Sequence, residues 1–146
     1  MIILLQRVKN ASVKVNEKTI AEINRGIVVF VGIEKGDSQR DIDYLVNKII
    51  NLRIFEDNNA KMNLSVKDVN GEIMVVSEFT LAGNCKKGNR PSFERAMPPK
   101  EAEKIYKDFI DTLRKTGISV KEGSFRSFMH VSLVNEGPVT FILSTR

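Results

Sequence analysis

The sequence predicts an α+β fold: a mostly antiparallel, curved, barrel-like sheet with about two helices packed outside it. Three observations predict this class. The chain holds seven or more short apolar segments bounded by turn residues, only two segments have helical spacing, and no strand is followed by a Gly-rich phosphate-binding fingerprint. Its 146 residues fit one domain and are too few for two ordinary ones, so we expect a single domain over 1–146.

Strands are predicted at the start of the chain. The apolar stretch 2–8 is followed by an alternating segment at 13–15 and, after a turn, by a third segment at 20–23. Residues 26–33 then form a continuous run of mainly β-branched residues that begins at a glycine. Such a run is typical of a strand that is covered on both faces.

Two segments change to helical spacing. The first covers residues 38–52, and Ser38 with Asp41 gives it a start that resembles a capping box. The second begins after Pro98–Pro99 and ends at Gly117. Its apolar side consists of Ala102, Ile105, Tyr106, Phe109, Ile110 and Leu113.

The other predicted strands come in pairs that are joined by turns. They cover residues 62–67, 73–80, 128–134 and 139–143. Asn70–Gly71 is a hairpin signal between the first two, and residues 135–138 predict a turn between the last two. This hairpin order favours antiparallel neighbours.

Composition excludes several kinds of chemistry. With one cysteine, Cys85, and one histidine, His130, the sequence predicts no disulfide, no metal site and no cofactor, and we place His130 on the polar face of a strand. The chain lacks an apolar run of the ~20 residues that span a membrane, and its N-terminus has no signal-peptide pattern. We therefore expect no membrane partner. The net charge of +5 permits an anionic partner such as a nucleic acid.

Residues 75–83 are the first segment that can carry chemistry. In an ideal strand, Ser77 and Phe79 share one face while Glu78 and Thr80 share the other. Two hydroxyl groups at the end of a strand, close to a glycine, can line a polar pocket. The same pattern also describes an ordinary strand terminus, because Thr favours strands and Ser and Gly favour turns.

Two further segments also allow a functional and a plain interpretation. The Gly137–Pro138 bond is either an ordinary trans turn peptide or a cis peptide that redirects two backbone carbonyls. The loop 84–95 carries Lys86, Lys87 and Arg90, which are either phosphate contacts or part of a solvated surface.

Together these segments resemble one family over essentially the whole chain, the D-aminoacyl-tRNA deacylases, also called D-tyrosyl-tRNA deacylases. Residues 77–81, Ser-Glu-Phe-Thr-Leu, are similar to the family's Ser-Gln-Phe-Thr-Leu motif. Residues 135–140, Asn-Glu-Gly-Pro-Val-Thr, are similar to its Gly-cis-Pro motif. Further similar stretches are 6–8, 11–13, 32–37, 53–55, 61–63 and 88–93.

The resemblance implies a homodimeric, cytoplasmic editing enzyme that hydrolyses the ester between a D-amino acid and the 3′-terminal adenosine of tRNA. In such an enzyme, Gly137 and Pro138 of one subunit enter the pocket of the other. Their carbonyls hold the amino group and leave no space for the Cβ of an L-amino acid, so glycyl-tRNA could also be accepted. Arg7 lies near this segment and steadies it.

The same resemblance places Ser77, Phe79 and Thr80 around the terminal adenosine and the ester. Because an aminoacyl ester is already activated, we expect backbone amides near Phe79 and Thr80 to stabilise the oxyanion, assisted by the 2′-hydroxyl of the tRNA. Glu78 stands where the family usually has Gln. It either pairs with a cation such as Arg7 or weakens activity, and a binding module without turnover is the alternative function.

Overall fold

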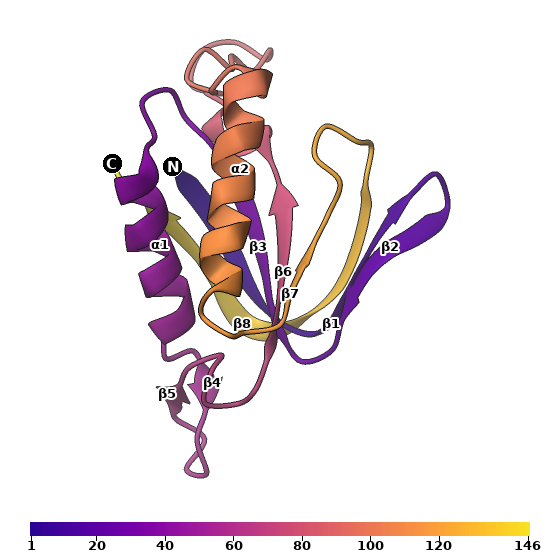
Figure 1. Ribbon diagram of the computed structural model, residues 1–146, viewed down its shortest axis with the longest axis vertical. Helices are drawn as coiled ribbons and strands as arrows, with labels where there is room; N and C mark the ends of the chain where they lie inside the picture. Colours follow the sequence, from indigo (N-terminus) through magenta and orange to yellow (C-terminus); the bar gives the residue numbers. More distant parts are fainter.

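The computed structural model describes all residues 1–146 and has two helices against one face of a curved, barrel-like sheet (Figure 1). The helices are α1 (Gln39–Asn51) and α2 (Pro99–Arg114), with a short 3₁₀ helix η1 (Phe79–Ala82). The strands are β1 (Ile2–Val15), β2 (Lys18–Ile23), β3 (Gly26–Gly32), β4 (Phe55–Glu56), β5 (Met62–Leu64), β6 (Glu72–Ser77), β7 (Val120–Glu122) and β8 (His130–Ser144). The predicted α+β class is confirmed, and neither helix is long and apolar enough to cross a membrane.

The main sheet is mixed rather than purely antiparallel. Its strand order is β2-β1-β3-β6-β7, and β8 runs along the other side of β1. All pairs that involve β1 are antiparallel, whereas β3–β6 and β6–β7 are parallel. The parallel pairs arise because α1 and α2 each connect strands that must enter the sheet from the same end.

The hairpin predicted at Asn70–Gly71 is wrong. These residues do form a turn, in which the Gly71 amide donates to the Val66 carbonyl at 2.9 Å. However, β5 pairs with β4 in a small separate sheet, and β6 lies parallel to β3. The central residues of β6 are buried on both faces of the sheet. This burial is typical of a parallel strand inside a sheet rather than of a hairpin strand at its edge.

The two closing strands predicted at 128–134 and 139–143 are one continuous strand, β8. Residues 135–138 do not turn the chain back. They lie within β8, where the pairing register with β1 shifts, and the Gly137–Pro138 peptide is cis. The strand predicted over 73–80 is shorter than expected, because β6 ends at Ser77 and the chain continues into η1.

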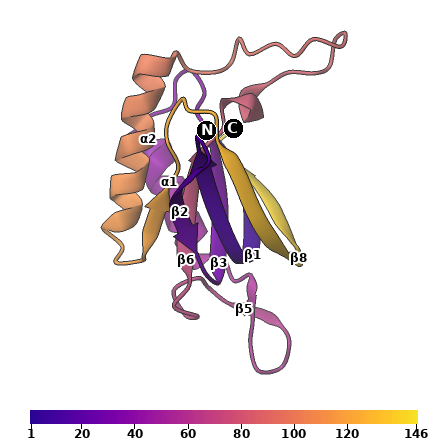
Figure 2. The same ribbon diagram turned by 90° about the vertical axis from the view of Figure 1, so that its right-hand side faces the viewer.

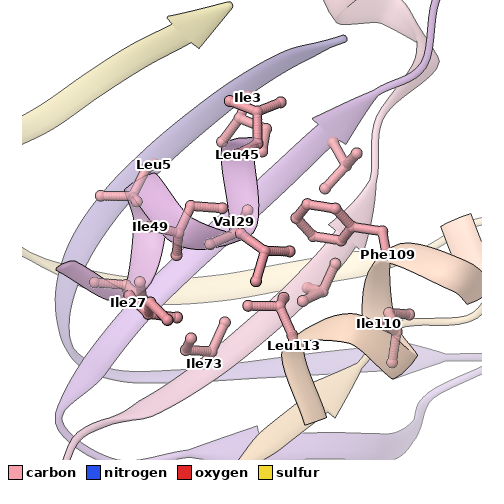
Figure 3. Packing of buried hydrophobic residues seen from close by; sticks show 14 of the residues in the cluster. Ile3, Leu5, Ile27, Val29, Leu45, Ile49, Ile73, Phe109, Ile110 and Leu113 are labelled. Carbon is pink, nitrogen blue, oxygen red and sulfur yellow. The ribbon is translucent and has the colours of Figure 1, made fainter. Parts of the chain in front are cut away.

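The main core lies between the sheet and the two helices. Figure 2 shows both helices on the same side of the sheet, and Figure 3 shows their side chains directed onto the strands. Both predicted helices are confirmed, and the capping box of α1 forms through Ser38 and Asp41, with a Ser38 amide to Asp41 Oδ2 distance of 2.9 Å. Core residues labelled in Figure 3 include Ile3, Leu5, Ile27, Val29, Leu45, Ile49, Ile73, Phe109, Ile110 and Leu113.

The opposite face of the sheet is only partly covered. The far ends of β1, β2 and β8 curl over it and enclose a second, smaller core around Val28 and Met74. Beyond that cover, the strand register aligns Ile142, Leu4 and Phe30 across β8, β1 and β3. We call these three residues the open-face row. Ile142 is 72% exposed, so the row leaves apolar surface in contact with water.

Candidate active site

A cavity of about 780 Å³ opens at the carboxyl ends of the parallel strands β3 and β6. The start of α2 and the segment between β7 and β8 form its other walls. Its lining includes Val31, Ile33, Lys35, Ser77, Glu78, Phe79, Phe93, Met97, Phe125, Arg126, Phe128 and Met129. This end of parallel strands is where ligands commonly bind, because side chains and backbone groups of several strands converge there.

The Ser77–Leu81 motif lies on this cavity because β6 stops and turns there. The Glu78 amide donates to the Val31 carbonyl of β3 at 2.8 Å, which closes the strand, and η1 begins at the next residue. Ser77, Glu78 and Phe79 line the cavity, while Thr80 lies beside it and donates its hydroxyl to a Glu78 carboxylate oxygen. Within one chain Glu78 pairs with Thr80, while Arg7 pairs with Glu56 and Glu136, so the pairing of Glu78 with a cation stays a prediction.

Gly32 allows η1 to pack tightly on the end of β3. A Cβ at this position would lie 2.8 Å from Leu81 Cβ and 3.1 Å from the Glu78 carbonyl oxygen. We expect Gly32→Ala to push η1 outward and to cost about 1–3 kcal/mol of stability, as overpacking usually does. Denaturant unfolding measures this cost, and an unchanged free energy of unfolding would contradict this account.

Two backbone amides at the start of η1 are free. The N–H groups of Phe79 and Thr80 donate to no group of the protein, as expected for the first turn of a helix. Phe79 is 59% exposed and Thr80 is exposed, so a ligand can reach this turn. A pair of adjacent free N–H groups is suited to stabilise the negative oxygen of a tetrahedral intermediate.

The aromatic and methionine wall of the cavity was missed by the sequence reasoning. The Phe79 and Phe93 rings meet edge to face with centroids 5.1 Å apart. The Phe125 ring packs on the Tyr106 ring with centroids 5.5 Å apart. The Tyr106 hydroxyl donates to the Val75 carbonyl at 3.1 Å. Burial raises the pKa of Tyr106, so its hydroxyl stays protonated and keeps this bond. The one sequence feature that could have indicated this wall is the close spacing of Phe125, Phe128 and Met129 just before β8.

Arg7 and the Gly137–Pro138 segment form a second group of candidate residues. Arg7 is 4% exposed; its Nε donates to the Glu136 carbonyl at 3.2 Å, and Nη1 donates to the Ile54 carbonyl at 2.6 Å. The Asn135 amide group donates to the Arg7 carbonyl at 3.0 Å. Gly137 and Pro138 themselves are exposed. Arg7 thus fixes the backbone that leads into an exposed Gly-Pro corner.

The two groups lie far apart within one chain. In the strand register, Ser77 is level with Val31 and with Ile3 of β1, whereas the Gly-Pro segment is level with Arg7 and lies three strands away. Standard strand spacings put the two groups on the order of 20 Å apart. None of Arg7, Gly137 or Pro138 lines the cavity.

The basic residues predicted as phosphate contacts lie on an exposed loop. Lys86, Lys87 and Arg90 are exposed, in the long segment between η1 and α2 that extends from the body of the molecule in Figure 2. Two other cations, Lys35 and Arg126, line the cavity itself. The cavity lining therefore carries two cations against one carboxylate, Glu78, and this excess of positive charge suits an anionic ligand.

Residues 4–144 match the family model of the D-Tyr-tRNA(Tyr) deacylases. A D-aminoacyl-tRNA deacylase of Thermodesulfovibrio yellowstonii is 73% identical over 146 residues and covers 100% of both chains. Another from Thermotoga petrophila is 52% identical over 142 residues, which are 97% of this chain and 95% of the relative.

Two solved structures share the fold. The structure of a c-Myc DNA unwinding element binding protein matches with a TM-score of 0.94 and 43% identity over 100% of this chain and 99% of the other. A probable eukaryotic D-amino acid tRNA deacylase matches with a TM-score of 0.81 over 97% of each chain, but at 17% identity this likeness supports the fold alone. The full-length matches in sequence, together with the motif on the cavity, establish that this chain is an enzyme of the D-aminoacyl-tRNA deacylase family of hydrolases.

Proposed function

We propose that this chain hydrolyses the ester of D-aminoacyl-tRNA to a D-amino acid and free tRNA, and that it leaves L-aminoacyl-tRNA intact. The observation that carries the proposal is the Ser77–Leu81 motif. Ser77, Glu78 and Phe79 line a cavity with an aromatic wall, and the adjacent Phe79 and Thr80 amides have no acceptor in the protein. Aromatic side chains stack on nucleobases regardless of base identity, so the wall suits the terminal adenosine. The cations Lys35 and Arg126 suit the phosphates that precede it.

The proposed reaction needs little side-chain chemistry. The ester carbonyl binds with its oxygen toward the Phe79 and Thr80 amides, and these amides stabilise the oxyanion that forms when water attacks. The 2′-hydroxyl of the terminal ribose orients that water and assists the transfer of its proton. The C–O bond to the ribose 3′-oxygen then breaks, and this oxygen takes up a proton. Ser77 lines the cavity beside the motif and helps to hold the ester.

The chiral filter in this proposal is supplied by a second subunit. Gly137 and Pro138 lie too far from Ser77 to act on the same ester within one chain, and both are exposed. In a homodimer, this segment enters the partner's cavity, and its backbone carbonyls accept hydrogen bonds from the substrate amino group. A rigid backbone wall rejects the Cβ of an L-amino acid by clash, and a clash discriminates more strongly than a missing contact.

The open-face row supports the proposed dimer. Ile142, Leu4 and Phe30 form apolar surface, and β8 has an unpaired outer edge along its length. Exposed apolar surface and an open strand edge are the features that association covers. The row also adjoins Thr140, whose hydroxyl accepts a bond from Gln6 at 3.1 Å, two residues beyond Pro138. Association through this face would bring the Gly-Pro segment close to the partner.

Three further parts of the proposal concern the setting of the reaction. Residues 1–146 act as one domain, since the main core joins β1 near the start of the chain, both helices and β8 near its end. Lys86, Lys87 and Arg90 contact phosphates of the acceptor end of the tRNA. The enzyme works in the cytoplasm, where its aminoacyl-tRNA substrates are formed, and glycyl-tRNA is a second substrate because glycine has no Cβ.

The first test is single-turnover deacylation of D-Tyr-tRNA beside L-Tyr-tRNA, with enzyme in excess and no added metal. We expect rapid loss of the D-ester while the L-ester stays intact. Binding of tRNA without hydrolysis of either ester would favour the binding-module alternative. Equal loss of both esters would refute the chiral filter while retaining the hydrolase.

Glu78→Gln is expected to keep or raise the rate of deacylation. Removing the carboxylate takes a negative charge from the cavity, where it repels the oxyanion and the tRNA phosphates. The amide oxygen of Gln can still accept the Thr80 hydroxyl. Glu94→Gln is the matched control, because Glu94 is exposed on the neighbouring loop and does not line the cavity. A clear loss of rate in Glu78→Gln alone would make the Glu78 carboxylate a functional group.

A further inference from the structure

Two buried carboxylates, Glu34 and Asp37, lie beside the cavity and have no role in the proposed reaction. Glu34 is 1% exposed and Asp37 is 7% exposed. Burial of two negative charges is strongly unfavourable unless cations pair with them. Both residues follow β3 directly, and the neighbours of Glu34 in sequence, Ile33 and Lys35, line the cavity.

Three cations surround this acidic pair. The α-amino group of Met1 lies 2.6 Å from Asp37 Oδ1 and 3.4 Å from Glu34 Oε2. Arg146 reaches the same two oxygens at 2.8 Å and 3.7 Å. Arg95 differs from these two, because it donates to the other oxygen of Glu34, Oε1, and makes no ion pair with Asp37. Glu34 therefore links Arg95 to a charge cluster that Met1 and Arg146 complete.

Arg95 belongs to the stretch 93–98, which forms one wall of the cavity. The lining residues in this stretch are Phe93, Ala96, Met97 and Pro98. Two backbone bonds attach the wall to the end of β3: the Lys35 amide donates to the Arg95 carbonyl at 2.9 Å, and the Met97 amide donates to the Ile33 carbonyl at 3.0 Å. The residues that precede the wall, 84–91, are exposed. The attachment to residues 33–35 therefore holds the wall in place.

We propose that Glu34 is a positioning residue of the active site. It anchors the Arg95 guanidinium, and through Arg95 it keeps the wall 93–98 at the spacing from β3 that the terminal adenosine ester requires. The inference rests on the proposed function, and it adds a residue that never touches the substrate. Its effect falls on substrate binding rather than on the oxyanion amides, which lie on η1 and are attached separately to β3.

Arg95→Ala and Arg146→Ala test the proposal as a matched pair. Both variants remove an arginine from the same carboxylate, but only Arg95 lies in the cavity wall. We expect Arg95→Ala to raise KM for D-Tyr-tRNA about five- to tenfold with kcat nearly unchanged, because it removes binding common to ground and transition states. Arg146→Ala should leave KM unchanged. An equal rise in both variants would overturn the proposal in favour of general destabilisation.

The double variant Glu34→Gln/Arg95→Ala separates positioning from direct contact with tRNA. The Arg95 side chain is 59% exposed and could instead bind a phosphate. If Arg95 acts with Glu34, the double variant raises KM no further than either single change, since interacting residues are not additive. If instead the double variant raised KM by the product of the two single increases, and KM of Arg95→Ala depended less on salt, Arg95 would be a tRNA contact. That result would overturn the role of Glu34.

Hydrogen exchange provides a readout that needs no substrate. The Lys35 and Met97 amides, which attach the wall, should lose protection about tenfold in Arg95→Ala and in Glu34→Gln, and keep it in Arg146→Ala. If the unmodified enzyme hydrolysed no ester, the proposed function would fail while this measurement would still decide the anchoring. Unchanged protection in Arg95→Ala would overturn the inference on its own.

Discussion

Replacing Ile142 by glutamate is expected to convert the proposed dimer to a monomer and to lower deacylation of D-Tyr-tRNA at least about a hundredfold, as the loss of a positioning element does. Ile142 is 72% exposed and lies at the end of the open-face row, so the isolated subunit tolerates a charge there. Across an apolar interface the same charge is unpaired and strongly unfavourable. Analytical ultracentrifugation and single-turnover assays of one preparation measure both effects.

Ile20→Glu is the control for this prediction. Ile20 is 43% exposed on β2, which pairs with the opposite edge of β1 from β8, so the same substitution should leave both dimer and activity intact. A fully active Ile142→Glu monomer would refute the supply of the Gly-Pro segment by a partner. An intact Ile142→Glu dimer would show that the subunits meet through another surface.

Mixed dimers provide the sharpest form of this test. A Cβ at Gly137 would meet only Asn135 Oδ1, at 3.8 Å, so Gly137→Ala should fold normally and act only where it enters the partner's cavity. We expect Gly137→Ala and Phe79→Ala to be weakly active alone and to recover about a quarter of full activity when mixed, because half of the dimers then hold one intact composite site. If each active site were formed within one chain, mixing the two variants would recover no activity.

Arg7→Ala is expected to cost about 3 kcal/mol of stability and to relax the discrimination between D- and L-esters. The change removes two charge-assisted bonds from a buried guanidinium and leaves the Ile54 carbonyl without that donor. The buried Glu136 Oε2, 3.4 Å from Arg7 Nε, has no hydrogen-bond partner and loses its nearest cation. The Gly-Pro corner then lacks its support, and its carbonyls lose their fixed direction.

Arg53→Ala is the matched control for Arg7→Ala. Arg53 also makes two bonds, both to Asn63 at 2.8 Å, but it is exposed and bonds to no residue of the Gly-Pro segment. Its loss should cost far less stability and leave the D-to-L rate ratio unchanged. Urea unfolding gives the stability change, and paired single-turnover assays give the ratio. An Arg7→Ala protein with wild-type discrimination would contradict the supporting role.

The sequence was informative where a local pattern determines the structure. Helical periodicity and the Ser38–Asp41 pair predicted α1, and the β-branched run 26–33 predicted the buried strand β3. Local patterns failed where the sheet topology depends on strands that are far apart in the sequence. Asn70–Gly71 forms a turn in either topology, and only the burial of β6 on both faces makes it a partner of β3.

The site followed the same division. The motif at 77–81 predicted three cavity residues, because one strand end carries them all. The wall formed by Phe93, Phe125 and Met129 comes from two distant loops, so no spacing along the chain joins them. Arg7 was correctly associated with the Gly-Pro segment, whereas within one chain it does not reach Glu78, because the two residues lie at opposite ends of the strands.

The free amides at the start of η1 have a consequence for how this enzyme can vary between lineages. Every residue except proline has a backbone N–H, so a site built from such groups depends on the path of the chain more than on the side chains that decorate it. An exchange of Gln and Glu at position 78 changes the side chain but leaves the backbone N–H groups of residues 79 and 80 in place. Selection then acts on the residues that shape the path, such as Gly32, and a search for lost activity among relatives should begin with them.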